Sequence, residues 1–405
     1  MNALYISYDG LTEPLGRSQI LPYLKALSKK GIFFTILTFE KQPDFKNIHQ
    51  ITRIKTEILN QFNIKWISLK YHRSPSLFAT AYDVLRGMLK ASYIVLKRKI
   101  TIVHCRSYVS MLIALPICSL SKKKIIFDMR GLWPDEKVEG GIWKEKGILY
   151  KIAKYFEKKF ILNSDQIIVL TSKMKRLIEE FEYTKDKKIN IYVIPTCVDL
   201  KKFHLKNQKR LSKESDIPNK DFVFVYAGSI GTVYMIEEVI KFFNVAFTVL
   251  DNSHLLILTH GNKEIIYKEA NRFNLNNHIT IKKVEYDDLP FWLSFGKVAI
   301  AFYKSSYSVY GRSPTKIGEY LACGLPIVVN SGVGDLDDII EKERVGIILK
   351  SFSEKSFHQS ILELKKLLKE KESLKTRCYL VAKKYFSLKS GVEEYAKIYQ
   401  WLYYS

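Results

Sequence analysis

The sequence predicts an α/β protein made of two doubly wound domains, each built on a parallel sheet. Three observations support this fold class. Short apolar segments alternate with helix-like segments along both halves of the chain, and strict alternation is typical of parallel strands joined by helical crossovers. The alternation restarts near residue 222 after a basic stretch. The chain has 405 residues, enough for two domains of about 200 residues each.

The predicted strands and helices follow one another in order. We expect residues 3–7 to form the first strand. They do not resemble the apolar part of a signal peptide, because no basic segment precedes them. In the rest of the first half we expect strands at 33–39, 64–69, 102–105, 124–128 and 166–170, and helices at 19–29, 77–97, 111–120 and 148–162. In the second half we expect strands at 222–226, 254–259, 279–283, 298–302 and 345–349, and helices at 236–249, 263–273 and 392–404.

A basic stretch predicts where the two domains meet. Residues 201–213 contain no acidic residue and separate the two runs of alternation, so we expect them to connect the domains. We therefore divide the chain into a first domain (1–198), a second domain (199–385) and a C-terminal helical segment (386–405).

The charge balance predicts an acidic partner. The chain has 65 Lys and Arg against 41 Asp and Glu, which gives a formal net charge of +24. Such an excess favours nucleic acid, an anionic membrane face or a polyanionic small substrate. The sequence has no compact nucleic-acid-binding motif, so we do not expect nucleic acid as a partner. Codon bias of an AT-rich genome is the alternative source of the excess.

The predicted helix at 77–97 is the expected membrane contact. Basic and apolar side chains are mixed along it and just beyond its end. The basic ones are Arg86, Lys90, Lys97, Arg98 and Lys99, and the apolar ones are Leu85, Met88, Leu89, Tyr93, Ile94 and Leu96. This mixture favours peripheral binding to an anionic membrane, and a solvated helix face is the alternative. The longest uncharged stretch, 107–121, is too short to span a bilayer.

No residues have the spacing of a metal site in this sequence. The five cysteines are scattered, as expected of buried thiols in a reducing compartment. Asp335 and Asp337 form an Asp-x-Asp pair, but they open a predicted helix. We therefore expect them to cap that helix, and we predict no metal.

Residues 311–340, GRSPTKIGEYLACGLPIVVNSGVGDLDDII, hold the strongest functional signal. We expect Ser313 to cap a helix, Pro314 to be its first residue and Gly324 to end it, with a buried strand after it.

The N-terminus of this predicted helix is a natural diphosphate site, because it offers free N–H groups and a partial positive charge. Thr315 lies in the opening turn, and Arg312 and Lys316 add full positive charges. Glu319 lies one turn further in, where it can accept hydrogen bonds from sugar hydroxyls. An ordinary helix–strand unit with surface charges is the alternative.

The segment PTKIGEYLACGLPIVVNSGVGDLDDII resembles the signature of glycosyltransferase family 4, retaining enzymes of the GT-B fold that use nucleotide sugars without a metal. The resemblance covers nearly the whole chain. It implies two Rossmann-like domains facing a cleft, with the final helix packing back on the first domain. In the family's Glu-x7-Glu pattern the second Glu binds the ribose, and Glu319 matches it. The first Glu falls at Gly311 and is missing, so the pattern does not identify the donor sugar.

The resemblance also implies loops that bind the donor. The family usually has an Arg and a Lys after the glycine loop at 228–231, and this chain lacks both, so Arg312 and Lys316 are expected to replace them. The donor-binding residues that we expect are Gly16, Gly228, Ser229, Gly231, Gly261, Arg312, Thr315, Lys316 and Glu319.

Two segments of the first domain supply candidate catalytic residues. In TIVHCRSY, the donor-sugar contact that the family makes with a His falls at His104 or Arg106, and Arg106 is the expected residue. Asp135 lies among acids and tryptophans in a segment that follows a strand, where it can deprotonate an acceptor hydroxyl. A structural Trp–Gly loop is the alternative there. Lys316 completes the catalytic set by stabilising the departing diphosphate.

These features predict a retaining, metal-independent glycosyltransferase that needs no cofactor beyond its donor, a nucleoside-diphosphate sugar. The expected acceptor is a lipid-linked surface glycan (lipopolysaccharide, capsule or exopolysaccharide), reached at the inner face of the cytoplasmic membrane. The alternatives are a GT-B nucleotide-sugar epimerase and, more remotely, a non-catalytic nucleic-acid-binding protein.

Overall fold

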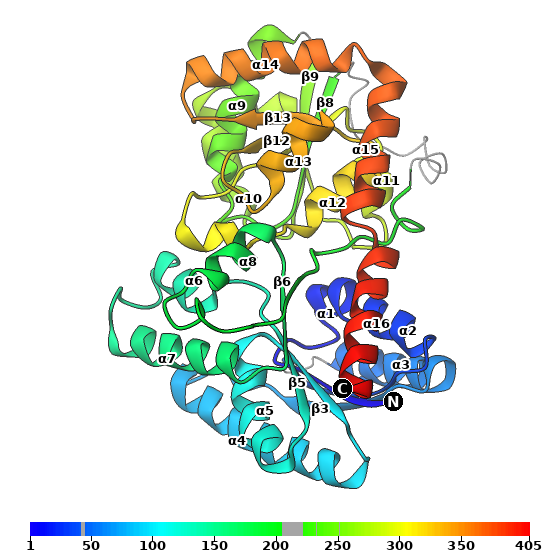
Figure 1. The fold of residues 1–405 in the computed structure, drawn as a ribbon. Coiled ribbons are helices and arrows are strands. Elements are labelled where there is room, and N and C mark those ends of the chain that lie inside the picture. Colours follow the sequence, from blue (N-terminus) through cyan, green and yellow to red (C-terminus); the bar gives the residue numbers. More distant parts are fainter. Residues whose placement is uncertain (42–44, 205–221, 232, 251) are drawn as a thin grey trace. The chain divides into compact units, whose positions relative to one another are not determined.

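The computed structural model describes residues 1–41, 45–204, 222–231, 233–250 and 252–405. It confirms the predicted α/β fold class. The chain forms two compact units (Figure 1): unit 1 is Met1–Pro195 with Leu388–Ser405, and unit 2 is Thr196–Ser387. Of the predicted connection at 201–213, residues 205–213 lie outside the described residues.

In its described residues, unit 1 holds a parallel sheet of seven strands in the order β3-β2-β1-β4-β5-β6-β7. The strands are β1 (Asn2–Ser7), β2 (Phe33–Glu40), β3 (Lys65–Lys70), β4 (Ile102–Arg106), β5 (Lys124–Asp128), β6 (Gln166–Val169) and β7 (Ile191–Val193). The helices are α1 (Pro14–Gln19), α2 (Leu21–Ser28), α3 (Phe45–Phe62), α4 (Ser76–Lys97), α5 (Ser107–Ser121), α6 (Trp133–Glu139), α7 (Ile148–Leu162), α8 (Ser172–Glu179) and α16 (Leu388–Tyr404).

Unit 2 repeats this plan with six strands among its described residues, in the order β10-β9-β8-β11-β12-β13. The strands are β8 (Phe222–Ala227), β9 (Ser253–Leu258), β10 (Ile279–Lys282), β11 (Val298–Ala301), β12 (Ile327–Asn330) and β13 (Gly346–Leu349). The helices are α9 (Ile236–Val249), α10 (Lys263–Arg272), α11 (Leu289–Leu293), α12 (Thr315–Ala322), α13 (Leu336–Glu343), α14 (Glu354–Leu368) and α15 (Lys371–Tyr385), with short 3-10 helices η2 (Asn276–His278) and η3 (Tyr307–Gly311).

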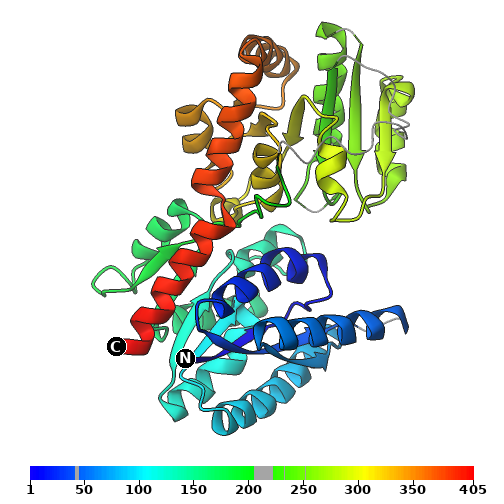
Figure 2. The same cartoon turned by 90° about the vertical axis from the view of Figure 1, so that its right-hand side faces the viewer.

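Helices cover both faces of each sheet, so the central strands are buried on both sides. In unit 1, α4, α5 and α7 pack together in one layer, and α2, α3 and α16 form the other (Figure 1). In unit 2, α9 packs with α14 and α12 packs with α15 (Figure 2).

Helix α16 is fixed to unit 1 by buried hydrogen bonds. The Tyr399 hydroxyl lies 2.8 Å from His104 Nδ1, and the Tyr395 hydroxyl donates to Asp128 Oδ2 at 3.2 Å. The last helix of the chain therefore closes one face of the sheet that the first strands build.

The strand order places one switch point in each sheet. The order reverses between β1 and β4 in unit 1, and between β8 and β11 in unit 2. Ligands of open parallel sheets bind beyond the carboxyl ends of the strands at such a point. The loops that follow β1, β4, β8 and β11 are therefore the first places to look for a site.

The structure differs from the local predictions in three places. The helix expected at 19–29 is α2 (Leu21–Ser28), but a separate short helix that was not expected, α1 (Pro14–Gln19), precedes it, because Pro22 in the first turn of α2 has no amide hydrogen with which to continue α1. The segment around Asp135, where a Trp–Gly loop was the alternative, contains helix α6, which starts with Pro134 in its first turn. No helix was expected at 45–62, where α3 lies.

Ser313 does not cap the helix of the signature segment, so that prediction was also wrong. Helix α12 starts at Thr315 with Pro314 at its N-cap. The Ser313 hydroxyl instead accepts from the Thr196 amide at 3.2 Å, and the Thr196 hydroxyl donates to the Ser313 carbonyl at 2.5 Å. The Ser313 hydroxyl therefore bonds to Thr196 and does not cap α12.

Candidate functional site

The candidate site of unit 2 begins in the loop after its central strand, β8. Gly228 and Gly231 have φ angles of +137° and +84°, which L side chains rarely adopt. The Gly228 amide donates to the Leu258 carbonyl at 2.9 Å, and the Tyr226 hydroxyl donates to the Ser229 carbonyl at 2.5 Å. These bonds hold the small-residue loop at the switch point of the sheet.

Helix α12 brings two charged residues under this loop. Lys316 and Glu319 are three residues apart, so they lie on the same side of the helix, and both are more than nine-tenths buried. The N-cap residue, Pro314, makes no side-chain cap. No side-chain cap therefore competes with a ligand for the amide groups of the first turn, which begins at Thr315.

The Lys316 ammonium is buried without a hydrogen-bond acceptor among the described residues. Its Nζ lies 4.5 Å from the ring centroid of Tyr226 and 4.1 Å from that of Tyr234. It also lies against Gly228, because a Cβ on that residue would stand 2.5 Å from Nζ. Burial lowers the pKa of Lys316 to about 7, and Glu319 only partly offsets this. A buried cation with aromatic contacts and no acceptor favours an anionic ligand.

Glu319 has its own set of neighbours. Burial raises its pKa to about 7, against the opposing effects of a hydrogen bond from Tyr286 and the charges of Lys316 and Lys202. Lys202 lies 3.8 Å from the centroid of the Tyr286 ring and pairs with Asp287 at 2.5 Å. A buried carboxylate beside a tyrosine hydroxyl can accept hydrogen bonds from a polar ligand such as a diol.

Gly261 joins the same edge from the loop after β9. A Cβ on Gly261 would lie 3.0 Å from the Ile230 side chain, so the loops after β8 and β9 are in contact. His260 Nε2 lies 2.8 Å from the Val284 carbonyl, which ties the loop after β9 to the loop after β10. The histidine therefore has a structural partner.

Arg312 and Thr315 lie at the start of α12. Thr315 is the first residue of that helix. Arg312 is three residues upstream, and its guanidinium donates to Ser308 Oγ at 3.3 Å. The structure therefore gathers the predicted donor-binding residues of unit 2 along one edge of its sheet, while their contact with a donor stays a prediction.

In unit 1, packing explains why residue 16 is a glycine. Gly16 lies in α1, and a Cβ there would come 2.1 Å from the Gly10 carbonyl oxygen and 2.6 Å from the Leu11 Cα. The same loop is anchored by buried Glu40, which accepts from the Leu11 amide at 2.8 Å and the Thr12 hydroxyl at 2.7 Å. The direct donor contact of Gly16 stays a prediction.

Arg106 belongs to a buried charge cluster at the carboxyl ends of β4 and β5. Burial alone would raise the pKa of Asp128, but Arg130, His104 and Arg106 lower it to about 2. Arg106 Nη1 lies 3.9 Å from Asp128 Oδ2, and its Nε lies 3.7 Å from Asp9 Oδ2 beside the switch point. Burial lowers the pKa of His104. His104 is therefore a neutral core residue, and Arg106 is the one that reaches the sheet edge.

Asp135 is engaged by both of its carboxylate oxygens. The Tyr150 hydroxyl donates to Oδ1 at 2.8 Å, and Lys154 Nζ donates to Oδ2 at 3.1 Å. Lys154 also pairs with buried Glu157, whose other oxygen accepts from the Tyr108 hydroxyl at 2.6 Å. This network holds α7 against α6. The catalytic role of Asp135 stays a prediction.

Sequence reasoning missed three tyrosines that form the walls of the unit 2 site: Tyr226, Tyr234 and Tyr286. Their positions carry no motif. Tyr226 is in a buried strand and the other two are in loops, so only the folded chain shows that their rings surround Lys316 and Glu319.

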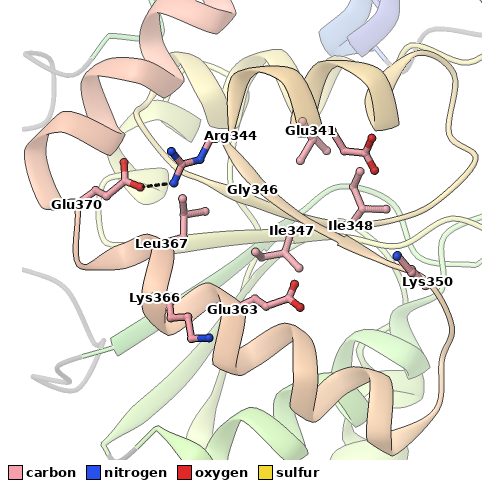
Figure 3. A pocket seen from close by; sticks show the side chains of 11 residues that line it. Glu341, Arg344, Gly346, Ile347, Ile348, Lys350, Glu363, Lys366, Leu367 and Glu370 are labelled. Atoms are coloured by element: carbon pink, nitrogen blue, oxygen red, sulfur yellow. Dashed lines mark hydrogen bonds and ion pairs between the residues drawn. The ribbon is translucent and has the colours of Figure 1, made fainter.

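A separate hollow of about 390 Å³ lies beside β13, the edge strand of unit 2 (Figure 3). It is lined by residues of α13, β13 and α14 and by Arg344, Lys350 and Glu370, which flank these elements. Acidic and basic side chains share its rim, and Arg344 pairs with Glu370 at 3.0 Å. Because these charges neutralise one another, we assign no ligand to this hollow.

Among the residues that the structure describes, no group of three or more His, Cys, Asp or Glu side chains is placed to hold a metal ion. In the same part of the chain, no helix combines the length and apolar composition needed to cross a membrane.

Family models match both halves of the sequence. The model described as Glycosyltransferase Family 4 matches residues 20–202, and the model described as Glycosyl transferases group 1 matches residues 207–380. No curated protein matches the chain.

Solved structures resemble the chain along nearly its whole length. Sucrose-phosphate synthase from Thermosynechococcus elongatus is 15% identical with a TM-score of 0.75, over 99% of each chain. A glycosyltransferase from Rickettsia africae is 14% identical with a TM-score of 0.71, over 99% of this chain and 98% of that one. Anabaena HepE, solved in complex with UDP and glucose, is 11% identical with a TM-score of 0.69, over 99% of each chain. At these identities the likeness shows the GT-B fold alone.

Proposed function

The chain belongs to the family 4, group 1 glycosyltransferases, and from this premise we propose that it moves a sugar from a nucleoside-diphosphate sugar to a lipid-linked surface glycan. Transfer proceeds with retention at the anomeric carbon and without a metal ion. The acceptor is of the lipopolysaccharide, capsule or exopolysaccharide class. The enzyme works as a peripheral protein on the inner face of the cytoplasmic membrane.

The observation that carries the donor assignment is the buried ammonium of Lys316. It lies 4.1 Å from the Tyr234 ring centroid and against Gly228, and it has no hydrogen-bond acceptor among the described residues. A diphosphate seated over the 228–231 loop supplies the missing acceptor, and the amides at the start of α12 add further donors. HepE in complex with UDP is a relative of the same fold that binds such a ligand.

We propose one role for each residue of the donor site. Glu319 accepts hydrogen bonds from the ribose hydroxyls, and Arg312 adds charge beside the diphosphate. The anomeric carbon–oxygen bond breaks as the acceptor oxygen bonds to the same carbon on the same face. The departing diphosphate takes the electron pair and the acceptor's proton. Lys316 stabilises the charge that grows on this leaving group.

In unit 1, Arg106 and Asp135 are the proposed catalytic residues, Arg106 as a contact of the donor sugar and Asp135 as the base for the acceptor hydroxyl, and Gly16 is a further proposed donor contact. Arg106 is the better supported of the two catalytic candidates. It reaches the switch point, where its Nε lies 3.7 Å from Asp9, whereas both oxygens of Asp135 are held by side chains of α7.

The membrane proposal is supported by the distribution of side chains on α4, where the large apolar residues face solvent and small residues face the protein. Its buried face consists mainly of small residues, and a Cβ on Gly87 would stand 2.7 Å from the Ile113 side chain of α5. Its solvent face carries large apolar residues, and Leu89 and Leu96 are 76% and 80% exposed. The exposed apolar residues of α4 are Leu77, Phe78, Tyr82, Leu85, Leu89, Tyr93 and Leu96. A helix with this pattern is typical of proteins that lie in a membrane interface.

Helix α7, which packs on α5 as α4 does, also carries exposed apolar residues. On α7 the exposed apolar residues are Ile148, Leu149, Ile152, Tyr155 and Phe156. The acids of these two helices, Asp83 and Glu157, are buried, whereas Lys97 and Lys158 are exposed. The exposed charges are therefore basic, which suits anionic lipid. A second copy of the chain would place the same basic residues opposite one another, so it suits this surface less well.

A panel of labelled nucleotide sugars, incubated with the protein and membrane extract, tests the proposal directly. We expect transfer to lipid-extractable product, with slow hydrolysis of the donor when no acceptor is added. The linkage of the product, read by NMR, reports retention, and activity in excess chelator reports metal independence. Isomerised sugar without release of nucleotide would instead indicate an epimerase. Neither transfer nor hydrolysis across the panel would contradict the proposal.

A further inference from the structure

A basic pocket in unit 1 lies where its edge strand, β3, meets α4. It has a volume of about 770 Å³ and is lined by Lys41, Tyr71, His72, Arg73 and Ser74. This volume is in the range of small-molecule sites, roughly 300–1,000 Å³. Of the described residues that line it, Lys41 and Arg73 are basic, His72 is a histidine, and none is acidic. The pocket is therefore complementary to an anion.

A buried carboxylate orients the histidine of this pocket. Asp83 of α4 is fully buried, and its Oδ1 lies 2.6 Å from His72 Nδ1. Because a carboxylate can only accept, Nδ1 carries the proton of this bond. Asp83 Oδ2 accepts from the His72 amide at 2.9 Å and from the Tyr8 hydroxyl at 3.1 Å. The two bonds from His72 fix its ring and its backbone, and the bond from Tyr8 holds the Asp83 carboxylate in place.

The other ring nitrogen of His72, Nε2, has no partner among the described residues, and the side chain is 30% exposed. Arg73, next in sequence, is exposed and completes the basic rim. The Lys41 ammonium pairs with Glu13 at 2.5 Å, so His72 and Arg73 are the nitrogen donors that remain for a ligand among the described lining residues.

The surroundings of the pocket indicate what kind of anion fits. Tyr8 follows β1 at the switch point, and its ring lies 5.3 Å from that of Tyr71, so the pocket adjoins the loops at the carboxyl edge of the sheet. On its other side α4 begins at Ser76, and Phe78 in the first turn is 75% exposed. The pocket thus lies between the switch point and the exposed apolar face of α4.

We infer that this pocket binds the phosphate group of the acceptor, with Arg73 and the imidazolium form of His72, which carries a proton on Nε2 as well as on Nδ1, as its donors and Asp83 as the residue that positions His72. A phosphate-linked lipid fits the arrangement, because its anionic group meets the basic rim while its apolar chain meets Leu77 and Phe78. The inference rests on the proposed glycosyl transfer, since it assigns the site of that reaction's second substrate.

Calorimetry on the full chain tests the inference with two probes, inorganic pyrophosphate and a short prenyl diphosphate. Excess nucleoside diphosphate is present, so that the Lys316 site is already filled. Arg73→Gln and His72→Gln should each weaken probe binding at least tenfold. Lys188→Gln is the matched control, since it removes an exposed lysine near β7, at the opposite edge of the sheet. It should leave binding unchanged.

The two probes separate the possible sources of the phosphate. Equal affinity for both would assign the pocket to a phosphate anion as such, and tighter binding of the prenyl probe would assign it to a lipid headgroup. Both results support the inference. Unchanged affinity in Arg73→Gln and His72→Gln, with their thermal unfolding unchanged, would overturn it.

A second measurement separates this inference from the proposed function. Arg73→Gln should raise the acceptor KM at least tenfold and leave nucleoside-diphosphate affinity and slow donor hydrolysis as in the wild type. A wild-type chain that binds no nucleoside diphosphate would contradict the proposed function instead. Normal donor affinity with an unchanged acceptor KM in Arg73→Gln would contradict only the pocket.

Discussion

Lys316 and Gly228 are 88 residues apart, yet a Cβ on Gly228 would stand 2.5 Å from the Lys316 Nζ. The glycine leaves the room that the ammonium occupies. The contact joins the loop after β8 to the first turn of α12, the two elements from which the donor site is built. The first prediction tests this contact.

Gly228→Ala should weaken nucleoside-diphosphate binding about tenfold or more, because the added methyl displaces the Lys316 ammonium. It should also destabilise the fold by about 1–3 kcal/mol, since φ is +137° at this position. Gly332→Ala is the control: its φ is +88°, and nothing lies within 4 Å of the added Cβ. Similar stability loss in both variants, with binding lost only in Gly228→Ala, supports the contact. Equal binding in both would contradict it.

Lys316→Met should raise the stability of the ligand-free protein while lowering turnover. A buried ammonium without a hydrogen-bond acceptor is costly, and an apolar chain of similar length removes that cost, so we expect a gain on the order of 1 kcal/mol near neutral pH. Turnover should fall on the order of a hundredfold, and more than donor affinity, because charge grows on the diphosphate as the bond breaks. Chemical denaturation measures the gain in stability, and steady-state kinetics measure the loss of turnover. Normal turnover would rule out the leaving-group role.

Glu319→Ala should weaken nucleoside-diphosphate binding by about 1–3 kcal/mol, because it removes charge-assisted hydrogen bonds to the ribose and leaves the Tyr286 hydroxyl without its partner. Pyrophosphate, which has no ribose, is the control ligand and should lose little affinity. Calorimetry with both ligands separates the two effects. If the variant lost affinity for both equally, Glu319 would act on the diphosphate region instead.

Nucleoside-diphosphate binding should release protons near pH 6 and take them up near pH 8. The pKa of Glu319 is raised to about 7, and ribose hydrogen bonds favour its ionised form, so binding releases a proton below pH 7. The pKa of Lys316 is lowered to about 7, and a bound diphosphate favours its charged form, so binding takes up a proton above pH 7. Calorimetry in buffers of different ionisation enthalpy measures the proton count. If binding only released protons, or only took them up, from pH 6 to pH 8, the proposed role of either Lys316 or Glu319 would be contradicted.

The same two residues predict a pH dependence of stability without ligand. The pKa of Glu319 is raised from 4.5 to about 7. Its contribution to the free energy of unfolding is therefore fully present below pH 4.5 and is lost as the pH rises toward 7. The pKa of Lys316 is lowered from 10.5, so between pH 7 and 10.5 the unfolded chain binds more protons and stability rises with pH. The two contributions together should give a minimum near pH 7, which should disappear in the Lys316→Met, Glu319→Gln double variant.

Binding to vesicles should need both the apolar face and the basic residues of α4. Changing Leu85, Leu89 and Leu96 to Ser should abolish binding to anionic vesicles, because these side chains are exposed and their burial in lipid drives insertion. Changing Arg86, Lys90, Lys97, Arg98 and Lys99 to Gln should weaken binding by several kcal/mol, at about 1 kcal/mol for each charge near the surface. If the wild type and both variants sedimented equally with vesicles, α4 would not be the membrane-binding helix. The control changes exposed leucines of unit 2, Leu362 and Leu380, to Ser.

The sequence by itself determined the fold class, because alternating apolar segments have few stable arrangements other than parallel sheets covered by helices. It placed the helix at 236–249 at its observed bounds. It also placed Lys316 and Glu319 on one side of a helix, since a spacing of three residues fixes that relation locally. These predictions depend on backbone periodicity alone.

Only the tertiary structure decided which of those residues are buried and what they touch. Ser313 is a natural helix cap, but its hydroxyl bonds to Thr196, which is 117 residues away in sequence. Helix α4 has apolar residues all around, and its small face is buried because only glycine at position 87 fits against Ile113. The aromatic walls around Lys316 and the carboxylate that fixes His72 likewise come from distant parts of the chain. Contacts of this kind depend on side-chain volume and on partners that the fold brings together, and local sequence pattern contains neither.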